Sequence, residues 1–264
     1  MTPSDESALN ENIGLVSELA RLMGDVAVAY YRTNVSIEAK GDGSPVTIAD
    51  RDAELAARRW IRDRFPNDGV LGEEYGEDGL GARRRWIIDP IDGTKAFVRG
   101  VPLWGSLVAL CEGESVVAGA ACFPVVNELI AAARGAGCWL NGSRCAVSSV
   151  DSLEHATVLT TDDRFHERRS RGAGWQRLAD AAGLSRTWGD CFGYLLVATG
   201  RAEAMVDPVV SAWDVAALQV IVTEAGGSFT DWDGQQTPFG GSAIATNRAL
   251  AAPIRSLLAD SETT

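Results

Sequence analysis

The feature that most constrains this fold is a core strand that ends in two carboxylates. Residues 86–94 read WIIDPIDGT, in which an apolar run typical of a buried strand stops at Asp89 and Asp92. Pro90 stands between them, and proline prevents a central strand from continuing. Charged aspartate is rarely buried unless it is paired or bound to a metal ion. We therefore expect this turn to hold a partner for its carboxylates.

The turn after this strand combines two kinds of ligand. Gly93 can complete the turn and Thr94 can begin a helix, which exposes the two carboxylates, the Ile91 carbonyl and free backbone N–H groups. Carboxylate and carbonyl oxygens suit Mg²⁺, and free N–H groups at a helix start suit phosphate. The turn is therefore predicted to bind a cation and an anion side by side.

Other carboxylates stand at similar ends of predicted elements. Glu73 and Glu74 follow a short strand and a glycine, and Asp214 begins an apolar helix. Asp50 lies in the first turn of a helix that Thr47 caps. An aspartate at a helix start is commonly only a cap, and glutamate pairs are commonly solvated. The two aspartates of the turn above are harder to explain in this way, because a cap needs one acid.

The charge balance limits the partners of the chain. Its 264 residues carry 24 basic and 36 acidic side chains, a net charge of −12, which argues against nucleic acid or anionic lipid as a partner. An acidic protein that handles phosphate needs metal cations to reverse the local charge. We find no apolar run near 18 residues and therefore predict no membrane span.

Two features favour a reducing cytoplasm. The stretch MTPSDESALNEN is polar and acidic, unlike a secretory signal. The five cysteines are odd in number and have no CxxC spacing, which is not typical of a disulfide framework.

Periodic patterns predict a mixed α/β chain. Apolar residues recur every three or four positions over 9–27, as in an amphipathic helix, and a second helix is expected from Thr47 to about Phe65. The stretch 38–47 is predicted to be a turn-rich loop. Strands are expected over 70–71, 86–89, 103–111, 116–123, 128–133, 156–161, 202–206 and 228–230, and later helices over 175–182, 192–199, 214–225 and 249–258.

These elements predict a layered architecture of helices and sheets. The first half, about 1–150, has an α+β pattern with a largely antiparallel sheet, and the second half, about 151–264, alternates strands with helices. No Pro/Ser-rich linker divides the chain, so we expect a single domain over 1–264.

Three segments in order resemble the motifs of the inositol monophosphatase family. They are Gly72-Glu-Glu74, Asp89-Pro-Ile-Asp-Gly-Thr94 and Trp213-Asp-Val-Ala-Ala217, the last followed by Glu224-Ala-Gly-Gly227. Members of this family are metal-dependent, lithium-sensitive phosphatases of small phosphomonoesters. The resemblance implies an αβαβα sandwich, a small phosphorylated metabolite as substrate and a homodimer.

The resemblance also implies a set of cation ligands. Glu73, Asp89 and the Ile91 carbonyl hold a first Mg²⁺, while Asp89, Asp92 and Asp214 hold a second, so that Asp89 bridges the two. A third, weaker ion depends on Glu73 and water. Two to three ions per site are therefore expected.

In the same resemblance the remaining roles belong to residues around the turn. The nucleophile is a metal-bound water that Thr94 orients, with Glu73 nearby and Asp50 behind Thr94. Backbone N–H groups of Gly93 and Thr94 hold the phosphate, together with Asp92. No covalent intermediate is implied.

Two further segments resemble the histidinol-phosphate phosphatase branch of the family. They are residues 188–194, WGDCFGY, and 95–102, KAFVRGVP. Asp190 and Asp207 could pair with the cationic groups of histidinol phosphate. Carboxylates also accept hydrogen bonds from sugar hydroxyls, so inositol phosphate stays open as the alternative substrate.

Two rivals from other classes remain. Cys138 and Arg144 fit C-x5-R, the pattern of cysteine-dependent phosphatases, but the glycines around them indicate a strand turn rather than the helix start that this chemistry needs. A metal- or sugar-phosphate-binding regulator on the same fold is less favoured, because Thr94 and Asp50 are both present.

Overall fold

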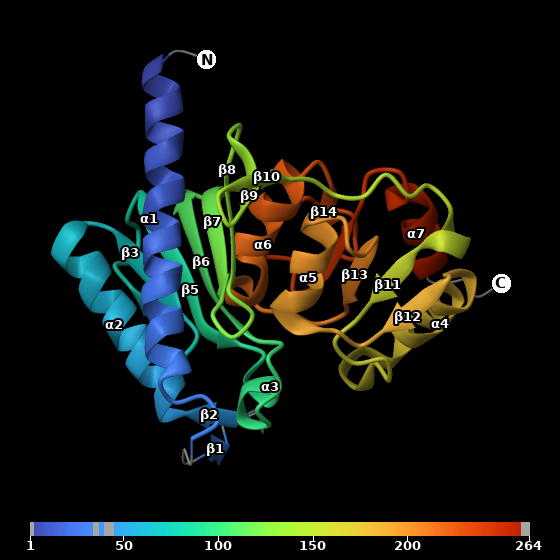
Figure 1. Cartoon of the computed structure of the whole chain (residues 1–264), viewed down its shortest axis with the longest axis horizontal. Coiled ribbons are helices and arrows are strands. Elements are labelled where there is room, and N and C mark those ends of the chain that lie inside the picture. Colours follow the sequence, from blue (N-terminus) through green and yellow to red (C-terminus); the bar gives the residue numbers. More distant parts are fainter. Residues whose placement is uncertain (1–2, 34–36, 40–44, 260–264) are drawn as a thin grey trace.

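The first β-sheet is large and mostly antiparallel. The computed structural model describes residues 3–33, 37–39 and 45–259, shown in Figure 1. The strand order is β10-β9-β8-β7-β6-β5-β3-β4, and only β3 and β5 pair in parallel. The strands are β3 (Gly69–Gly72), β4 (Gly76–Asp78), β5 (Arg84–Asp92), β6 (Gly105–Glu112), β7 (Ser115–Phe123), β8 (Glu128–Ala133), β9 (Gly137–Leu140) and β10 (Ser143–Cys145).

Helices cover both faces of this sheet. The long helix α1 (Pro3–Val28) and α2 (Ile48–Arg64) pack on one face, and α6 (Ala212–Glu224) packs on the other (Figure 1). Because side chains alternate along a strand, each strand serves both interfaces. Trp86, Ile88 and Val108 contact the α1–α2 layer, whereas Ile87 and Leu107 belong to the core on the α6 side. Burial of both faces explains the unbroken apolar run over 86–88 in the middle of β5.

A second, five-stranded sheet lies beyond α6. Its order is β12-β11-β13-β15-β14, in which β11 pairs in parallel with β12 and β13, while β15 runs antiparallel to its neighbours. The strands are β11 (Thr157–Leu159), β12 (Leu184–Arg186), β13 (Ala204–Asp207), β14 (Ser228–Thr230) and β15 (Ala243–Thr246).

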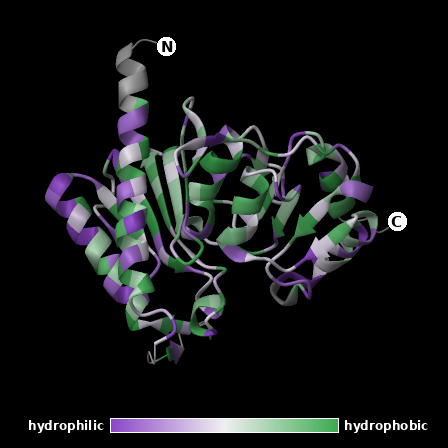
Figure 2. Ribbon diagram, viewed as in Figure 1, coloured by the Kyte–Doolittle hydropathy of each residue, from purple (hydrophilic) through white to green (hydrophobic). Residues whose placement is uncertain are grey.

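The middle layer of the molecule consists of α5 (Asp190–Ala198) and α6, which lie between the two sheets. Figure 2 colours these helices largely hydrophobic, as expected for helices that are covered on opposite sides. The outer face of the second sheet carries α4 (Gly172–Ala181) and α7 (Ala251–Leu258). The layers are therefore helix, sheet, helix, sheet, helix, which confirms the predicted αβαβα sandwich.

Several short elements differ from the predictions. The predicted loop over 38–47 contains β1 (Ile37–Ala39) and β2 (Pro45–Thr47), which pair with each other, while residues 40–44 lie outside the described part. The strand β15 was missed because its four residues include two alanines, which are weak strand formers. The remaining short helices are α3 (Thr94–Val98), η1 (Leu153–His155) and η2 (His166–Arg171).

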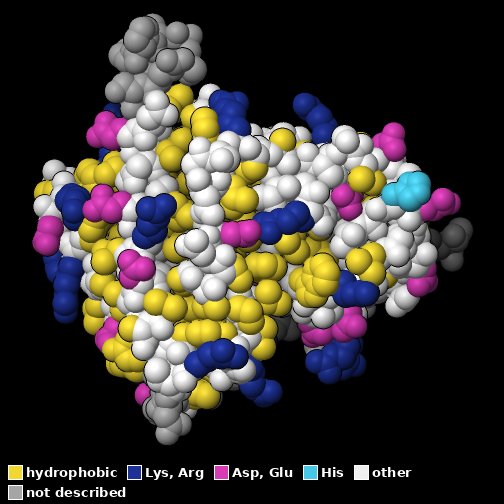
Figure 3. All heavy atoms as spheres, in the orientation of Figure 1, with side chains coloured by type: hydrophobic (Ala, Val, Ile, Leu, Met, Phe, Trp, Pro, Cys, Tyr) yellow, Lys and Arg dark blue, Asp and Glu magenta, His cyan; other side chains and the backbone are white. Residues whose placement is uncertain are grey.

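The surface carries charges of both signs. On the face shown in Figure 3, Lys/Arg and Asp/Glu side chains are scattered among apolar and neutral ones rather than gathered into one field. Within the described residues, no helix has both the length and the apolar character to span a bilayer.

Candidate active site

The strand β5 does not end at Asp89 as predicted but bulges and continues to Asp92. Its register against β6 shifts between these two residues. The Ile91 N–H donates to Asp89 Oδ1 at 3.0 Å, and the Ser106 hydroxyl donates to the Pro90 carbonyl at 2.6 Å. A bulge redirects side chains that would otherwise alternate between faces. Here it aims both aspartates at the same region.

Gly93 makes the sharp turn into α3. Its φ of 86° lies in the left-handed region, and a Cβ there would stand 2.9 Å from the Leu103 carbonyl oxygen, so glycine is required. Thr94 follows as the first helical residue, and its hydroxyl donates to the Ile91 carbonyl at 3.0 Å. The predicted turn residues are therefore adjacent in space.

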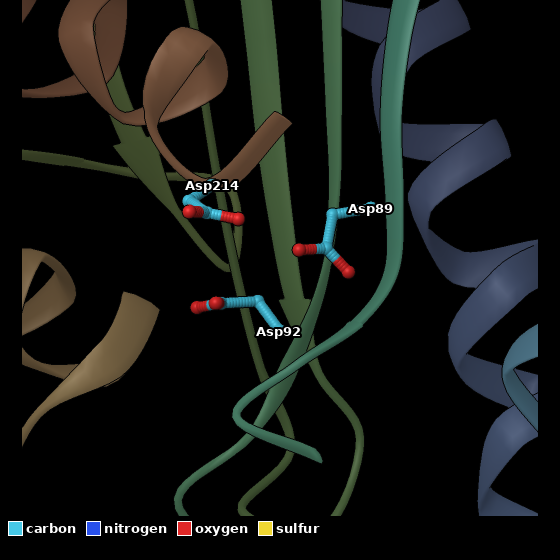
Figure 4. Close-up of side chains that lie close together, drawn as sticks. All are labelled: Asp89, Asp92 and Asp214. Atoms are coloured by element: carbon cyan, nitrogen blue, oxygen red, sulfur yellow. The ribbon is translucent and has the colours of Figure 1, made fainter. Parts of the chain in front are cut away.

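Three aspartates from distant parts of the chain converge at this turn. Ligand oxygens of Asp89, Asp92 and Asp214 lie within 4.8 Å of one another, and Figure 4 shows the three side chains around one space. Asp214 comes from the first turn of α6, where its Oδ2 also accepts the Ser211 N–H at 2.7 Å. Asp92 Oδ2 accepts the Cys191 N–H at the start of α5.

Glu73 joins this cluster through the parallel pairing of β3 and β5. Gly72 lies opposite Ile88, so the next residue of each strand, Glu73 or Asp89, reaches the same end of the sheet. The negative charge of Glu73 raises the pKa values of Asp89, Asp50 and Asp214, although burial is the larger cause for each. The structure therefore brings together all four predicted carboxylate ligands.

The cluster is strongly destabilised in its fully charged form. Burial raises the pKa of Asp89 and of Asp92 well above the usual range, and the neighbouring carboxylates raise both further. Burial also raises the pKa of Asp214 to about 7. Like charges this close in a buried site disfavour ionisation unless a cation is present.

Asp50 combines a cap with an unsatisfied oxygen. Its Oδ2 accepts the Thr47 N–H at 2.8 Å and the Thr47 hydroxyl at 2.7 Å, which forms the predicted capping box of α2. Its Oδ1 is buried and has no hydrogen-bond partner within the described residues. The Thr94 hydroxyl, predicted to lie in front of Asp50, donates to Ile91 instead.

These residues fit a divalent metal ion of the Mg²⁺ type. All the side-chain donors are carboxylates, the hard oxygen ligands that such ions prefer. The unsatisfied Asp50 oxygen and the mutual repulsion of the cluster indicate a place for positive charge.

A small cavity continues from the cluster toward the second sheet. It measures about 80 Å³ and joins the carboxylates to the predicted substrate residues Asp190 and Asp207. Asp207 accepts the Thr161 N–H at 3.0 Å and the Tyr194 hydroxyl at 2.9 Å. The Asp190 N–H donates to the Thr161 hydroxyl at 2.9 Å. Thr161 therefore links the two acids, a role that no local pattern predicts.

Asp190 lies in an unusual backbone conformation at the start of α5. Its φ of 52° is left-handed, which few residues other than glycine adopt. Burial and the nearby Asp207 raise the pKa of Asp190 to about 6, while Lys95 opposes the increase. An adjoining cavity of about 180 Å³ is lined by Lys95, Thr161 and Asp207. The region is therefore acidic, with one lysine at its edge.

The cysteine-dependent alternative is wrong. Cys138 and Arg144 lie on the β9–β10 hairpin rather than before a helix. Contact with Cys145, whose sulfur is 3.4 Å away, and burial raise the pKa of the Cys138 thiol. Arg144 donates to the Ala136 carbonyl at 3.1 Å. A buried thiol with a raised pKa is a poor nucleophile.

Known proteins resemble this chain over most of its length. Residues 9–262 match the inositol monophosphatase family. The histidinol-phosphatase of Chlorobaculum parvum is 41% identical over 92% of this chain and 94% of its own length. That of Mycobacterium tuberculosis is 42% identical, over 84% and 88% respectively. The solved structure of an inositol monophosphatase from Zymomonas mobilis has a TM-score of 0.84 and 32% identity, covering 94% of this chain and 98% of its own.

The fold, the acidic cluster and these matches define a class of small-molecule phosphatase. The chain belongs to the inositol monophosphatase family and is a phosphoric monoester hydrolase. Its relatives named histidinol-phosphatase agree with the resemblance in residues 95–102 and 188–194.

The metal-free protein is expected to lose stability as the pH rises. Because burial raises the pKa of Asp214 to about 7, the folded state keeps a proton that the unfolded state releases above about pH 4. The free energy of unfolding should therefore fall from about pH 4 to pH 7. Thermal unfolding in a chelator should show a Tm that decreases across this range.

Asp214→Asn should reduce this pH dependence, because asparagine can still cap α6 but does not titrate. The matched control is Asp151→Asn at an exposed position, which should retain the wild-type slope. Equal slopes in the wild type and in Asp214→Asn would contradict the assignment.

Proposed function

We propose that this phosphatase hydrolyses L-histidinol phosphate to L-histidinol and phosphate, a step of histidine biosynthesis, with Mg²⁺ as its cation. The observation that supports this substrate is an acidic pair beside the carboxylate cluster, formed by the half-buried Asp190 and the buried Asp207. Histidinol phosphate carries a protonated amine and an imidazole that titrates near neutrality, and carboxylates bind such groups strongly. The relatives named histidinol-phosphatase support the same substrate.

The proposed cation ligands are the carboxylates of Glu73, Asp89, Asp92 and Asp214 and the carbonyl of Ile91. Asp89 would belong to both ligand sets, and Glu73 would also support a weaker third ion. When bound, the ions neutralise phosphoryl oxygens, lower the pKa of water and stabilise the leaving alkoxide.

The remaining chemistry belongs to residues of the turn. Thr94 orients the attacking water through its hydroxyl, which now donates to the Ile91 carbonyl on the cation side. Glu73 lies near that water, and Asp50 stands behind Thr94 with one unsatisfied oxygen as an acceptor. The backbone N–H groups of Gly93 and Thr94 hold the phosphate, together with Asp92.

Inositol 1-phosphate is the second candidate substrate. Asp190 and Asp207 can accept hydrogen bonds from ring hydroxyls as well as from cations. The similarity to an inositol monophosphatase of solved structure supports this alternative. The proposal also includes a homodimer in the cytoplasm, with 1–264 acting as one catalytic domain.

Purified protein with Mg²⁺ should release phosphate from histidinol phosphate with a kcat/KM at least about tenfold above that for inositol 1-phosphate, because only the first substrate presents cations to the acidic pair. Steady-state phosphate release on both substrates measures this ratio. The reverse preference would overturn the substrate assignment while leaving the phosphatase chemistry intact.

Asp89→Asn should reduce kcat for both substrates by at least about a thousandfold, because it removes the proposed bridging ligand. The variant should still fold, since it removes a repelled charge from a buried cluster. Circular dichroism and Tm provide that control. An active Asp89→Asn protein would show that the ligand assignment is wrong.

Asp190→Asn should raise the KM for histidinol phosphate about tenfold, because it removes a charge-assisted contact. Hydrolysis of p-nitrophenyl phosphate, which lacks an amine, should change little. Asp163→Asn, at an exposed nearby position, is the matched control. A uniform loss on both substrates would argue for a role in the phosphate site instead.

A further inference from the structure

A buried glutamate outside the carboxylate cluster lies against the turn that follows Glu73. Glu54, on α2, is completely buried, although glutamate is among the residues least often found there. Its Oε2 accepts the Glu74 N–H at 2.8 Å, and its Oε1 accepts the Tyr75 N–H at 3.1 Å. Both bonds go to the turn that joins β3 to β4, immediately after Glu73.

Arg58, one helical turn after Glu54, extends the same contact. Its Nε donates to Glu54 Oε1 at 2.8 Å, which neutralises the buried carboxylate. Its other nitrogens donate to the Gly76 carbonyl and, at 2.7 Å, to Asp78 Oδ2. The pair therefore binds the turn at both of its ends, with the planar guanidinium providing the geometry.

The last residue of β3, Gly72, leaves space for the Glu54 carboxylate. A Cβ at Gly72 would overlap Glu54 Oε1, so the close approach of the carboxylate requires glycine at this position. Gly72 directly precedes Glu73. Glu54 therefore contacts the residues on both sides of Glu73 in the sequence. It packs against Gly72 before it and accepts hydrogen bonds from the Glu74 and Tyr75 amides after it.

A hairpin turn does not by itself need such an anchor. Turns of this length normally lie in water and close through their own backbone bonds. A buried charge is costly and is retained where its partners need a defined arrangement. The feature that distinguishes this turn is Glu73, which the parallel pairing of β3 with β5 brings to the same end of the sheet as Asp89.

We propose that Glu54, with Arg58 as its counterion, is a positioning residue that holds Glu73 at the carboxylate cluster. Glu54 fixes the two amides that follow Glu73 and packs against Gly72, which precedes it, so the backbone on both sides of the proposed ligand is held in place. Glu54 thus positions a metal ligand before the ion binds. Mutation of supporting residues of this kind typically weakens metal affinity 10- to 100-fold. This inference rests on the proposed role of Glu73 as a cation ligand.

Glu54→Gln tests the proposal with the least change in shape. The amide keeps one acceptor oxygen but places an NH₂ group where a backbone N–H or the Arg58 guanidinium now donates. Isothermal titration calorimetry of the metal-free protein with Mg²⁺ should show a Kd weakened about tenfold. The kcat at saturating Mg²⁺ should return close to that of the wild type, with the change confined to the Mg²⁺ concentration required.

The matched control is Glu203→Gln. Glu203 is also a buried glutamate that accepts a backbone N–H, that of Thr157 at 2.6 Å, but it precedes β13 at the end opposite Asp207. This variant should lower the Tm without changing the Kd for Mg²⁺. An equal weakening of Mg²⁺ binding in Glu203→Gln would overturn the proposal, because a general loss of stability would then explain both.

Arg58→Lys provides a second variant in case Glu54→Gln does not fold. Lysine keeps the charge but cannot reproduce the planar set of hydrogen bonds that Arg58 donates to Glu54, Gly76 and Asp78, so Mg²⁺ binding should also weaken. Wild-type Mg²⁺ affinity in a folded Glu54→Gln or Arg58→Lys protein would overturn the inference.

Glu73→Gln, titrated in the same way, separates this inference from the proposed function. If Glu73→Gln weakens Mg²⁺ binding while folded Glu54→Gln does not, only the positioning role fails. If Glu73→Gln binds Mg²⁺ like the wild type, the proposed ligand set fails, and the positioning role fails with it.

Discussion

Repulsion among buried carboxylates is the constraint on which the rest of this structure depends. The fold holds the aspartates in place by giving each one a backbone N–H donor on one oxygen. Asp89 accepts from Ile91, Asp92 from Cys191 and Asp214 from Ser211. These N–H donors lie in a β-bulge, at a helix start and in a capping box, which are ordinary local structures. Each therefore fixes one oxygen and leaves the other available to the shared space.

The layered architecture follows from the need to deliver these groups from opposite sides. The bulge of β5 belongs to the first sheet, whereas α5 and α6 belong to the middle layer and pack against both sheets. Their first turns provide the Cys191 N–H and the Asp214 carboxylate. A shift of either helix would thus change the carboxylate cluster and the adjoining cavity together. The packing of the apolar core between the sheets therefore helps to fix the positions of the site residues.

Local signals in the sequence were sufficient for some of this arrangement. Pro90, Gly93 and the Thr47 cap each predict a feature from a few neighbouring residues, and the motifs identified the four clustered carboxylates. The sequence did not predict that β5 bulges rather than ends, nor the roles of Thr161 and Glu54. Their bonds join residues far apart in the chain, 29 residues for Thr161 with Asp190 and 20 for Glu54 with Glu74. Such contacts depend on how the layers pack, and no periodic pattern records them.

The proposed chemistry and the proposed substrate preference depend on different parts of the molecule. The carboxylate cluster centres on one turn of the first sheet, whereas Asp190 and Asp207 come from α5 and β13 and meet through Thr161. The left-handed backbone of Asp190 carries a conformational cost of about 1–3 kcal/mol, which the contact with Thr161 helps to offset. Strain of this kind persists where surrounding structure requires it, commonly at ligand sites. Under the proposed function, changes around Asp190 would therefore alter which ester is bound while the turn over 89–94 stays constant.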